Sequence, residues 1–268
     1  MISAKEIIAY MESLRNEEQR RILMRFFKTG PSEYGEGDEF LGLKVPQTRE
    51  IVKNTWKDFP LREVPEFLMS KWHEVRLCGL LILVAKFEKL SPLPTSPRRG
   101  GDMKRRGNDE AAIRGRDEIL TMYLKYAERA NNWDLVDLSA PKILGASLLS
   151  PLKGGDPELD IKYKRELLDE LAHSDNLWKQ RMSMVCSWKT SQMGNPFWCL
   201  RYAEIHLHHP HDLMHKAVGW MLREMGKRCS MELLRDFLRQ HTHEMPRTML
   251  RYAIEKMSEQ ERQYWMTT

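Results

Sequence analysis

Apolar residues recur every three or four positions along most of this chain, a spacing that predicts α-helices. Two helices are expected within residues 3–29. In the first, Ser3 and Glu6 match a capping box ahead of an apolar stripe. The second is expected to begin at Asn16, to end at Gly30-Pro31 and to bury its apolar residues Ile22, Leu23, Phe26 and Phe27.

Residues 72–90 have apolar side chains on every face of the expected helix, which predicts a central position for it. Further helical patterns lie at about residues 46–56, 60–70, 120–127, 133–149, 167–171, 176–188, 196–206, 212–227, 233–238 and 247–257. No segment alternates as a strand would. About twelve or more helices, paired at roughly 40-residue intervals, predict an all-α fold. We expect one domain, residues 1–268, forming a C-shaped α-solenoid of HEAT-like repeats whose concave face suits a long ligand.

Residues 91–116 interrupt the helical pattern with many Pro, Gly and Ser residues. We expect a disordered insertion at about residues 91–110. The segment is also basic, with Arg98, Arg99, Lys104, Arg105, Arg106, Arg114 and Arg116. Two roles fit this composition: contact with nucleic-acid phosphates, or a solvated insertion without a function.

Composition narrows the class of protein. The chain has 268 residues, 41% hydrophobic and 30% charged, and a net charge of +5, which permits a polyanionic partner without requiring one. No apolar run approaches the ~20 residues of a membrane helix, and the N-terminus lacks a signal-peptide core. The four cysteines form no CxxC pair, which favours reduced thiols in the cytoplasm.

The segment Asn131-Asn132-Trp133-Asp134-Leu135-Val136-Asp137 carries the first candidate site. Either asparagine can cap a helix N-terminus. Trp133 and Asp137 are four residues apart and share one helix face, where an aromatic ring and a carboxylate can hold a cationic or electron-poor ligand. The alternative is a core tryptophan beside a solvated aspartate.

A second candidate lies in the predicted helix 212–227. Lys216, Trp220, Arg223 and Lys227 form one stripe, and Arg247 and Arg251 share a face of a later helix. Basic and aromatic side chains together suit phosphates and a sugar or base, so inward-facing stripes predict duplex nucleic acid as the ligand. For each cation taken singly, a surface salt bridge is the alternative. His211 and His215 could together bind a metal, but no Cys or carboxylate cluster completes such a site.

Four segments together resemble one family: YGEGDEFLGLKVPQTR, NNWDLVD, HKAVGWMLREMGK and MPRTMLRYAIEKM. They span nearly the whole chain and resemble the bacterial DNA alkylation repair glycosylases of AlkD type. The resemblance implies HEAT-like repeats in a C-shape around double-stranded DNA. It implies removal of N3- and N7-alkylated purines by cleavage of the N-glycosidic bond, without a metal or organic cofactor, by a protein for which a monomer suffices.

The resemblance also assigns roles. Asp137 matches the catalytic carboxylate, and Trp133 and Trp220 match two tryptophans that pack on the lesion's deoxyribose. Arg181 matches a DNA-contacting arginine, although Gln180 replaces a basic residue common before it, and the loop around Tyr34 is expected to touch the duplex. The DNA-binding set is then Arg181, Lys216, Arg223, Lys227, Arg247 and Arg251. The alternative is a non-catalytic HEAT scaffold that binds DNA or protein and does not need Trp133, Asp137 and Trp220 to converge.

Overall fold

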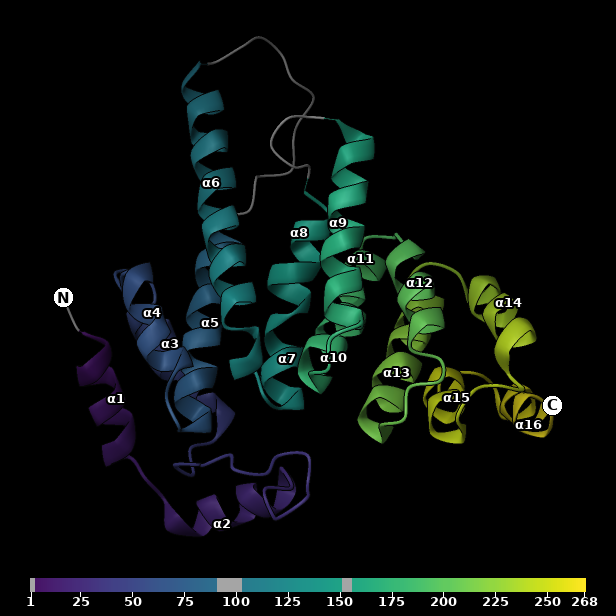
Figure 1. Ribbon diagram of the computed structural model, residues 1–268, viewed down its shortest axis with the longest axis horizontal. Coiled ribbons are helices and arrows are strands. Elements are labelled where there is room, and N and C mark those ends of the chain that lie inside the picture. Colours follow the sequence, from purple (N-terminus) through teal and green to yellow (C-terminus); the bar gives the residue numbers. More distant parts are fainter. Residues whose placement is uncertain (1–2, 91–102, 151–155) are drawn as a thin grey trace. The chain divides into compact units, whose positions relative to one another are not determined.

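The computed structural model describes residues 3–90, 103–150 and 156–268 (Figure 1). Within these ranges the chain is helical and contains no strand, apart from one isolated bridge between Glu39 and Trp72. The predicted all-α fold is confirmed, and the succession of short-linked helices agrees with an α-solenoid.

Contacts divide the chain into two units, residues 1–139 and 140–268. The single domain and the C-shape stay predictions. None of the described helices has the length and apolar composition needed to cross a bilayer.

Unit 1 contains seven α-helices among the described residues, with two short 3-10 turns between them. In chain order they are α1 (Ala4–Ser13), α2 (Glu17–Phe26), α3 (Val45–Thr55), η1 (Leu61–Glu63), α4 (Val64–Leu68), α5 (His73–Lys89), α6 (Met103–Lys125), η2 (Ala127–Arg129) and α7 (Trp133–Ser139). The predicted capping box at Ser3 and Glu6 starts α1, and Pro46 lies in the first turn of α3.

Helix α5 is the centre of unit 1, as its apolar pattern predicted. It packs against α3, α4, α6 and α7 (Figure 1). Every residue from His73 to Val84 is buried. Its first turn is not apolar, however, because His73, Glu74 and Arg76 are buried there together with the leucines and valines that follow. The core therefore contains charged groups whose partners must be supplied by neighbouring segments.

The burial predicted for the second helix is wrong for Ile22 and Phe26, and Leu23 is only half-buried. The side chains of Ile22 and Phe26 are 47% and 60% exposed, and no residue of α2 is buried. Only Phe27, the residue that ends the helix, enters the core. The spacing correctly identified an amphipathic helix, but spacing cannot show that its apolar face is only partly covered within unit 1.

The predicted insertion is partly helical. Residues 91–102 lie outside the described residues, whereas α6 already begins at Met103. Residues 103–110 thus belong to a helix, since this stretch follows the last proline of the segment, Pro97, and leads into the helix formers Ala111 and Ala112, and the expected disorder of the insertion stays a prediction.

Unit 2 is also built of helices. They are the π-helix η3 (Pro141–Gly145), α8 (Ala146–Leu148), α9 (Pro157–Ala172), α10 (Leu177–Val185), α11 (Ser187–Gln192), α12 (Phe197–Ile205), α13 (Asp212–Arg228), α14 (Met231–His241), α15 (Arg247–Ile254) and α16 (Glu259–Thr267). The most extensive packing is between α13 and α15. Gly219 permits it, because a Cβ there would lie 2.3 Å from the Met249 carbonyl oxygen and 2.5 Å from the Tyr252 Cβ.

Candidate active site

Helix α7 carries two predicted site residues, Trp133 and Asp137, one turn apart. Asn132 begins the helix: its Oδ1 accepts a hydrogen bond from the Trp133 N–H at 2.9 Å, and its carbonyl oxygen accepts one from the Val136 N–H at 3.2 Å. Both site side chains are half-buried, and Asp137 also interacts with other groups of the protein. The spacing places the indole and the carboxylate on one helix face.

The indole of Trp133 rests on two phenylalanines from the end of α2. It stacks on Phe27 with centroids 5.3 Å apart and planes inclined 28°, and the ring of Phe26 meets it edge-on at 5.9 Å. Aromatic pairs in these geometries add about 0.5–1.5 kcal/mol beyond the area they bury. The two phenylalanine rings therefore fix the indole of Trp133, and part of the indole surface stays exposed to solvent.

A buried charge cluster lies behind α7. His73, which is 2% exposed, places Nδ1 2.7 Å from Asp38 Oδ2 and Nε2 3.0 Å from Asp134 Oδ2. Arg76 Nη2 donates to the other oxygen of Asp38. Asp134 belongs to α7 and directly follows Trp133, so this cluster ties the helix that carries the site to α5.

The four side chains of this cluster balance in charge only if His73 is protonated. Burial disfavours the charged imidazole, but the Asp134 carboxylate and the hydrogen bonds to both aspartates outweigh burial and raise the pKa of His73 to about 9. Burial likewise opposes ionisation of Asp38, yet His73 and Arg76 hold the pKa of that carboxyl below its ordinary value. The cluster thus holds two carboxylates and two cations at neutral pH.

The loop between α2 and α3 supplies Asp38 to this cluster and packs around the first turn of α5. Glu74 accepts three backbone N–H bonds from it, those of Leu41 at 2.9 Å, Gly42 at 2.8 Å and Leu43 at 3.0 Å. A Cβ at Gly35 would lie 2.4 Å from the Phe27 carbonyl oxygen, so only glycine fits there. The segment YGEGDEF therefore delivers a buried aspartate to the core, whereas the predicted contact of Tyr34 with a duplex stays a prediction.

The C-terminal end of α7 is fixed as well. Ser139 Oγ donates to the Leu135 carbonyl at 2.6 Å and lies 3.0 Å from the Tyr123 hydroxyl of α6. Pro141 has no N–H to continue the helix, and α7 ends at Ser139. The seven-residue helix is therefore anchored at its start, along its buried face and at its end.

Trp220 and the predicted basic stripe lie on α13 of unit 2. Trp220 is half-buried, and its convergence with Trp133 and Asp137 stays a prediction. Lys216 Nζ lies 2.7 Å from Asp212, and Arg223 pairs with Glu255 and lies 3.5 Å from Glu224. Two of the predicted phosphate contacts are thus already paired with carboxylates in the free protein.

The other predicted cations divide by exposure. Arg181 is buried at 5% exposure and donates to the Leu213 carbonyl at 2.6 Å, so it also holds α10 against the start of α13. Arg247 is exposed and donates to the Met266 carbonyl at 2.8 Å. Lys227 and Arg251 are exposed and, among the described residues, form no ion pair. These last two are the cations most available to an anionic ligand.

The histidines near the start of α13 serve as hydrogen-bond partners within unit 2. His211 Nδ1 accepts from the Leu213 N–H at 3.1 Å and caps α13, which requires an unprotonated nitrogen. Burial lowers the pKa of His211 and of His209. The part of the chain that is described holds no group of three or more His, Cys, Asp or Glu side chains suited to a metal. The metal-site alternative thus gains no support from His211 and His215.

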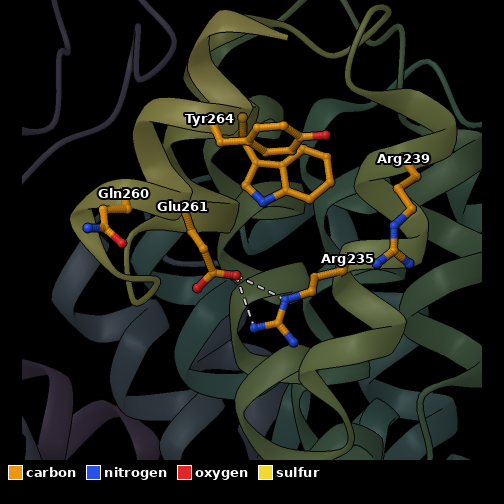
Figure 2. Close-up of a pocket in the computed structure, with 6 residues that line it drawn as sticks. Arg235, Arg239, Gln260, Glu261 and Tyr264 are labelled. Carbon is orange, nitrogen blue, oxygen red and sulfur yellow. Dashed lines mark hydrogen bonds and ion pairs between the residues drawn. The ribbon is translucent and has the colours of Figure 1, made fainter.

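A surface pocket of about 380 Å³ lies between α14 and α16, and no predicted site residue lines it (Figure 2). Its walls include Arg235, Arg239 and Tyr264. Arg235 forms ion pairs with Glu261 and Glu232, and Arg239 with Glu232 and Asp236. Three carboxylates surround two arginines, so this pocket does not suit an anionic ligand such as a phosphate.

Local sequence motifs identified the candidate site residues, but they did not identify the buried residues that hold α7 in place. Asp38, His73 and Arg76 were missed because their partners lie 35 to 61 residues apart in sequence. One signal was available: charged residues inside the otherwise apolar segment 72–90 require buried partners. Asp134 was quoted within the motif but given no role.

Comparison with known proteins was made on sequence and on structure. The profile of the family described as "DNA alkylation repair enzyme" matches residues 7–257. A search of curated proteins gave no match. Among solved structures, the chain is similar to a predicted DNA alkylation repair enzyme from Enterococcus faecalis, with a TM-score of 0.61 and 13% identity over 91% of this chain and 97% of that one. At this identity, the likeness concerns the fold.

Proposed function

Because this chain belongs to the DNA alkylation repair enzyme family, we propose that it is a monofunctional glycosylase that removes N3- and N7-alkylated purines from double-stranded DNA. The proposal follows the resemblance in its motifs and rests on the pairing of Trp133 with Asp137 on a helix anchored on several sides. A monomer acting in the bacterial cytoplasm, without a metal or organic cofactor, suffices for this role.

The chemistry needs few groups. An N3- or N7-alkylated purine already carries a positive charge, so it leaves without a general acid. The enzyme must stabilise the oxocarbenium-like sugar and admit a water molecule. Polysaccharide hydrolases need two carboxylates because their leaving group must be protonated, whereas one carboxylate is enough here.

Asp137 is proposed to supply that carboxylate. A fixed negative charge near the anomeric carbon stabilises the developing positive charge, and the same group can orient the attacking water. The exposed part of Trp133 offers a π face to the cationic sugar. Trp220 is proposed to pack on the same deoxyribose from unit 2.

Phosphate contacts are proposed for the six predicted cations. Lys227 and Arg251 form no ion pair with any described residue that a phosphate would have to replace, whereas Lys216 and Arg223 would exchange Asp212 and Glu255 for phosphate. Arg247 would donate to phosphate beside its bond to the Met266 carbonyl, whereas a phosphate contact by Arg181 is proposed from the resemblance alone.

The decisive experiment incubates the protein with an oligonucleotide duplex that contains one N7-methylguanine and measures the free base released. The same duplex with guanine is the control for substrate, and the Asp137→Asn variant is the control for the site. Release of N7-methylguanine by the wild type only would support the glycosylase. DNA binding without base release would instead favour the non-catalytic scaffold.

A second assay tests the absence of a covalent intermediate. The proposed reaction uses water and needs no lysine that forms a Schiff base with the sugar. Borohydride added during the reaction should therefore trap no protein–DNA adduct. A trapped adduct would show a lyase mechanism and contradict the monofunctional assignment.

A further inference from the structure

We infer that His73 acts as a buried imidazolium clamp that positions α7, and with it Trp133 and Asp137, for the reaction. This inference rests on the proposed function for its effect on base release. His73 is 2% exposed and lies behind the helix, so it acts through other residues rather than on the DNA.

The first argument is the hydrogen-bond geometry. Both ring nitrogens of His73 lie within 3.0 Å of a carboxylate oxygen, one of Asp38 and one of Asp134. A neutral imidazole has one donor and one acceptor, so one of these contacts would set a lone pair against a carboxylate. The protonated ring donates to both, which makes it the form that joins the loop carrying Asp38 to α7.

The second argument concerns the charges packed around His73. Asp38 comes from the loop before α3, Asp134 from α7 and Arg76 from α5 itself. Arg129 of η2 lies close by, donating to the carbonyls of Leu68 and Ser70. Without a proton on His73, Arg76 would still pair with Asp38, but Asp134 would have no directly bonded cation among the described residues, and burial penalises such an unpaired charge.

Two routes lead from His73 to the candidate site. Asp134 lies one residue after Trp133 and three before Asp137, so the His73–Asp134 bond fixes how α7 is turned about its axis. The His73 ring also lies 5.0 Å from Phe27, the ring on which Trp133 stacks. The ring of Phe40 stacks on the His73 ring, with centroids 4.3 Å apart, and on that of Phe27 at 5.1 Å. One residue thereby orients both the carboxylate-bearing helix and the indole.

The test compares His73→Gln and Asp134→Asn with a matched control, Phe67→Leu. Phe67 is fully buried in α4 of the same unit, and its ring packs on that of Phe59. The first two variants should release base on the order of 100-fold more slowly in single-turnover assays, as expected for a misplaced catalytic group. Their affinity for the DNA should change less than threefold, and Phe67→Leu should keep the wild-type rate.

A readout without DNA separates the clamp from the proposed function. Amide hydrogen exchange should become faster in Trp133–Ser139 for His73→Gln and Asp134→Asn but stay unchanged in Val45–Thr55. NMR of the wild-type protein should show both His73 ring nitrogens protonated at pH 7, a measurement that holds even if the variants fold poorly. A neutral His73 at pH 7, or wild-type exchange in α7 of the variants, would overturn the clamp. A wild-type protein that releases no base would refute the glycosylase alone.

Discussion

The ring of Phe27 stacks on the indole of Trp133, with centroids 5.3 Å apart and planes inclined 28°. Phe27 directly follows α2, and Trp133 is the first residue of α7. The stack therefore joins the end of the amphipathic helix α2 to the helix that carries the candidate site. Phe27 is buried because its ring also packs on Phe40 and His73, whereas Phe26, which meets the indole edge-on, stays exposed.

Replacement of Phe27 by leucine should loosen Trp133 with little loss of core volume. Loss of the stack should cost about 0.5–1.5 kcal/mol of unfolding free energy, and base release should slow several-fold because the indole is no longer held. Urea unfolding and single-turnover assays with N7-methylguanine DNA measure the two effects. Phe59→Leu, in an aromatic pair with Phe67, is the matched control and should affect stability only.

Replacement of Asp137 by asparagine should remove the charge but keep the shape of the side chain. Loss of one electrostatic stabiliser typically slows a reaction by about 100- to 1,000-fold, or about 2.7–4 kcal/mol of barrier. Base release should fall by this factor, while titration with labelled duplex should give a nearly unchanged dissociation constant. A variant that releases base at the wild-type rate would remove Asp137 from the mechanism.

The sequence was most informative where structure is local. The capping box at Ser3 and Glu6 and the start of the second helix at Asn16 are each settled within four residues, and each was predicted. The position of Trp133 and Asp137 on one helix face is equally local. The apolar helix 72–90 was predicted to be central because no face of it could remain in water.

The buried residues that hold the site in place could not be predicted in the same way. The partners of His73 lie 35 and 61 residues away, and only the fold brings them together. The exposure of Ile22 and Phe26 likewise depends on which segments cover α2. Pairing of Lys216 with Asp212 lies within one helix and could have been expected, whereas that of Arg223 with Glu255 depends on how α13 meets α15.

The cations of unit 2 should differ in their effect on the salt dependence of DNA binding. Lys227→Gln should reduce the slope of log affinity against log salt by about 0.9, because it removes one phosphate contact and breaks no ion pair in the free protein. Binding is measured between low and moderate salt by fluorescence anisotropy. Lys162→Gln on α9, an exposed lysine outside the predicted set, should leave the slope unchanged. Equal slopes for both variants and the wild type would exclude Lys227 from the interface.

The raised pKa of His73 predicts a loss of stability at alkaline pH. The pKa is about 9 in the folded protein and ordinarily 6.5. The stabilisation from the proton is fully present below pH 6.5 and is lost as the pH rises through about 9. Urea unfolding between pH 6 and 9.5 should show this decline in the wild type and a flatter profile in His73→Gln. A wild-type profile that stays level to pH 9.5 would contradict it.

The histidine buried in unit 2 should act in the opposite direction. Ser183 Oγ donates to the Gln180 carbonyl, so His206 Nε2, 2.8 Å away, must donate to Ser183. Burial, with smaller effects of His209 and His173, lowers the pKa of His206 to about 4 from an ordinary 6.5. The folded state therefore keeps His206 neutral, and this stabilisation is present above pH 6.5 and is lost as the pH falls through about 4. Between pH 7 and 4 the loss should be on the order of 3 kcal/mol.

His206→Gln should remove this acid-dependent decline, while His208→Gln, at an exposed histidine of the same segment, should retain it. Equal acid profiles for the two variants would show that His206 is not the group that titrates.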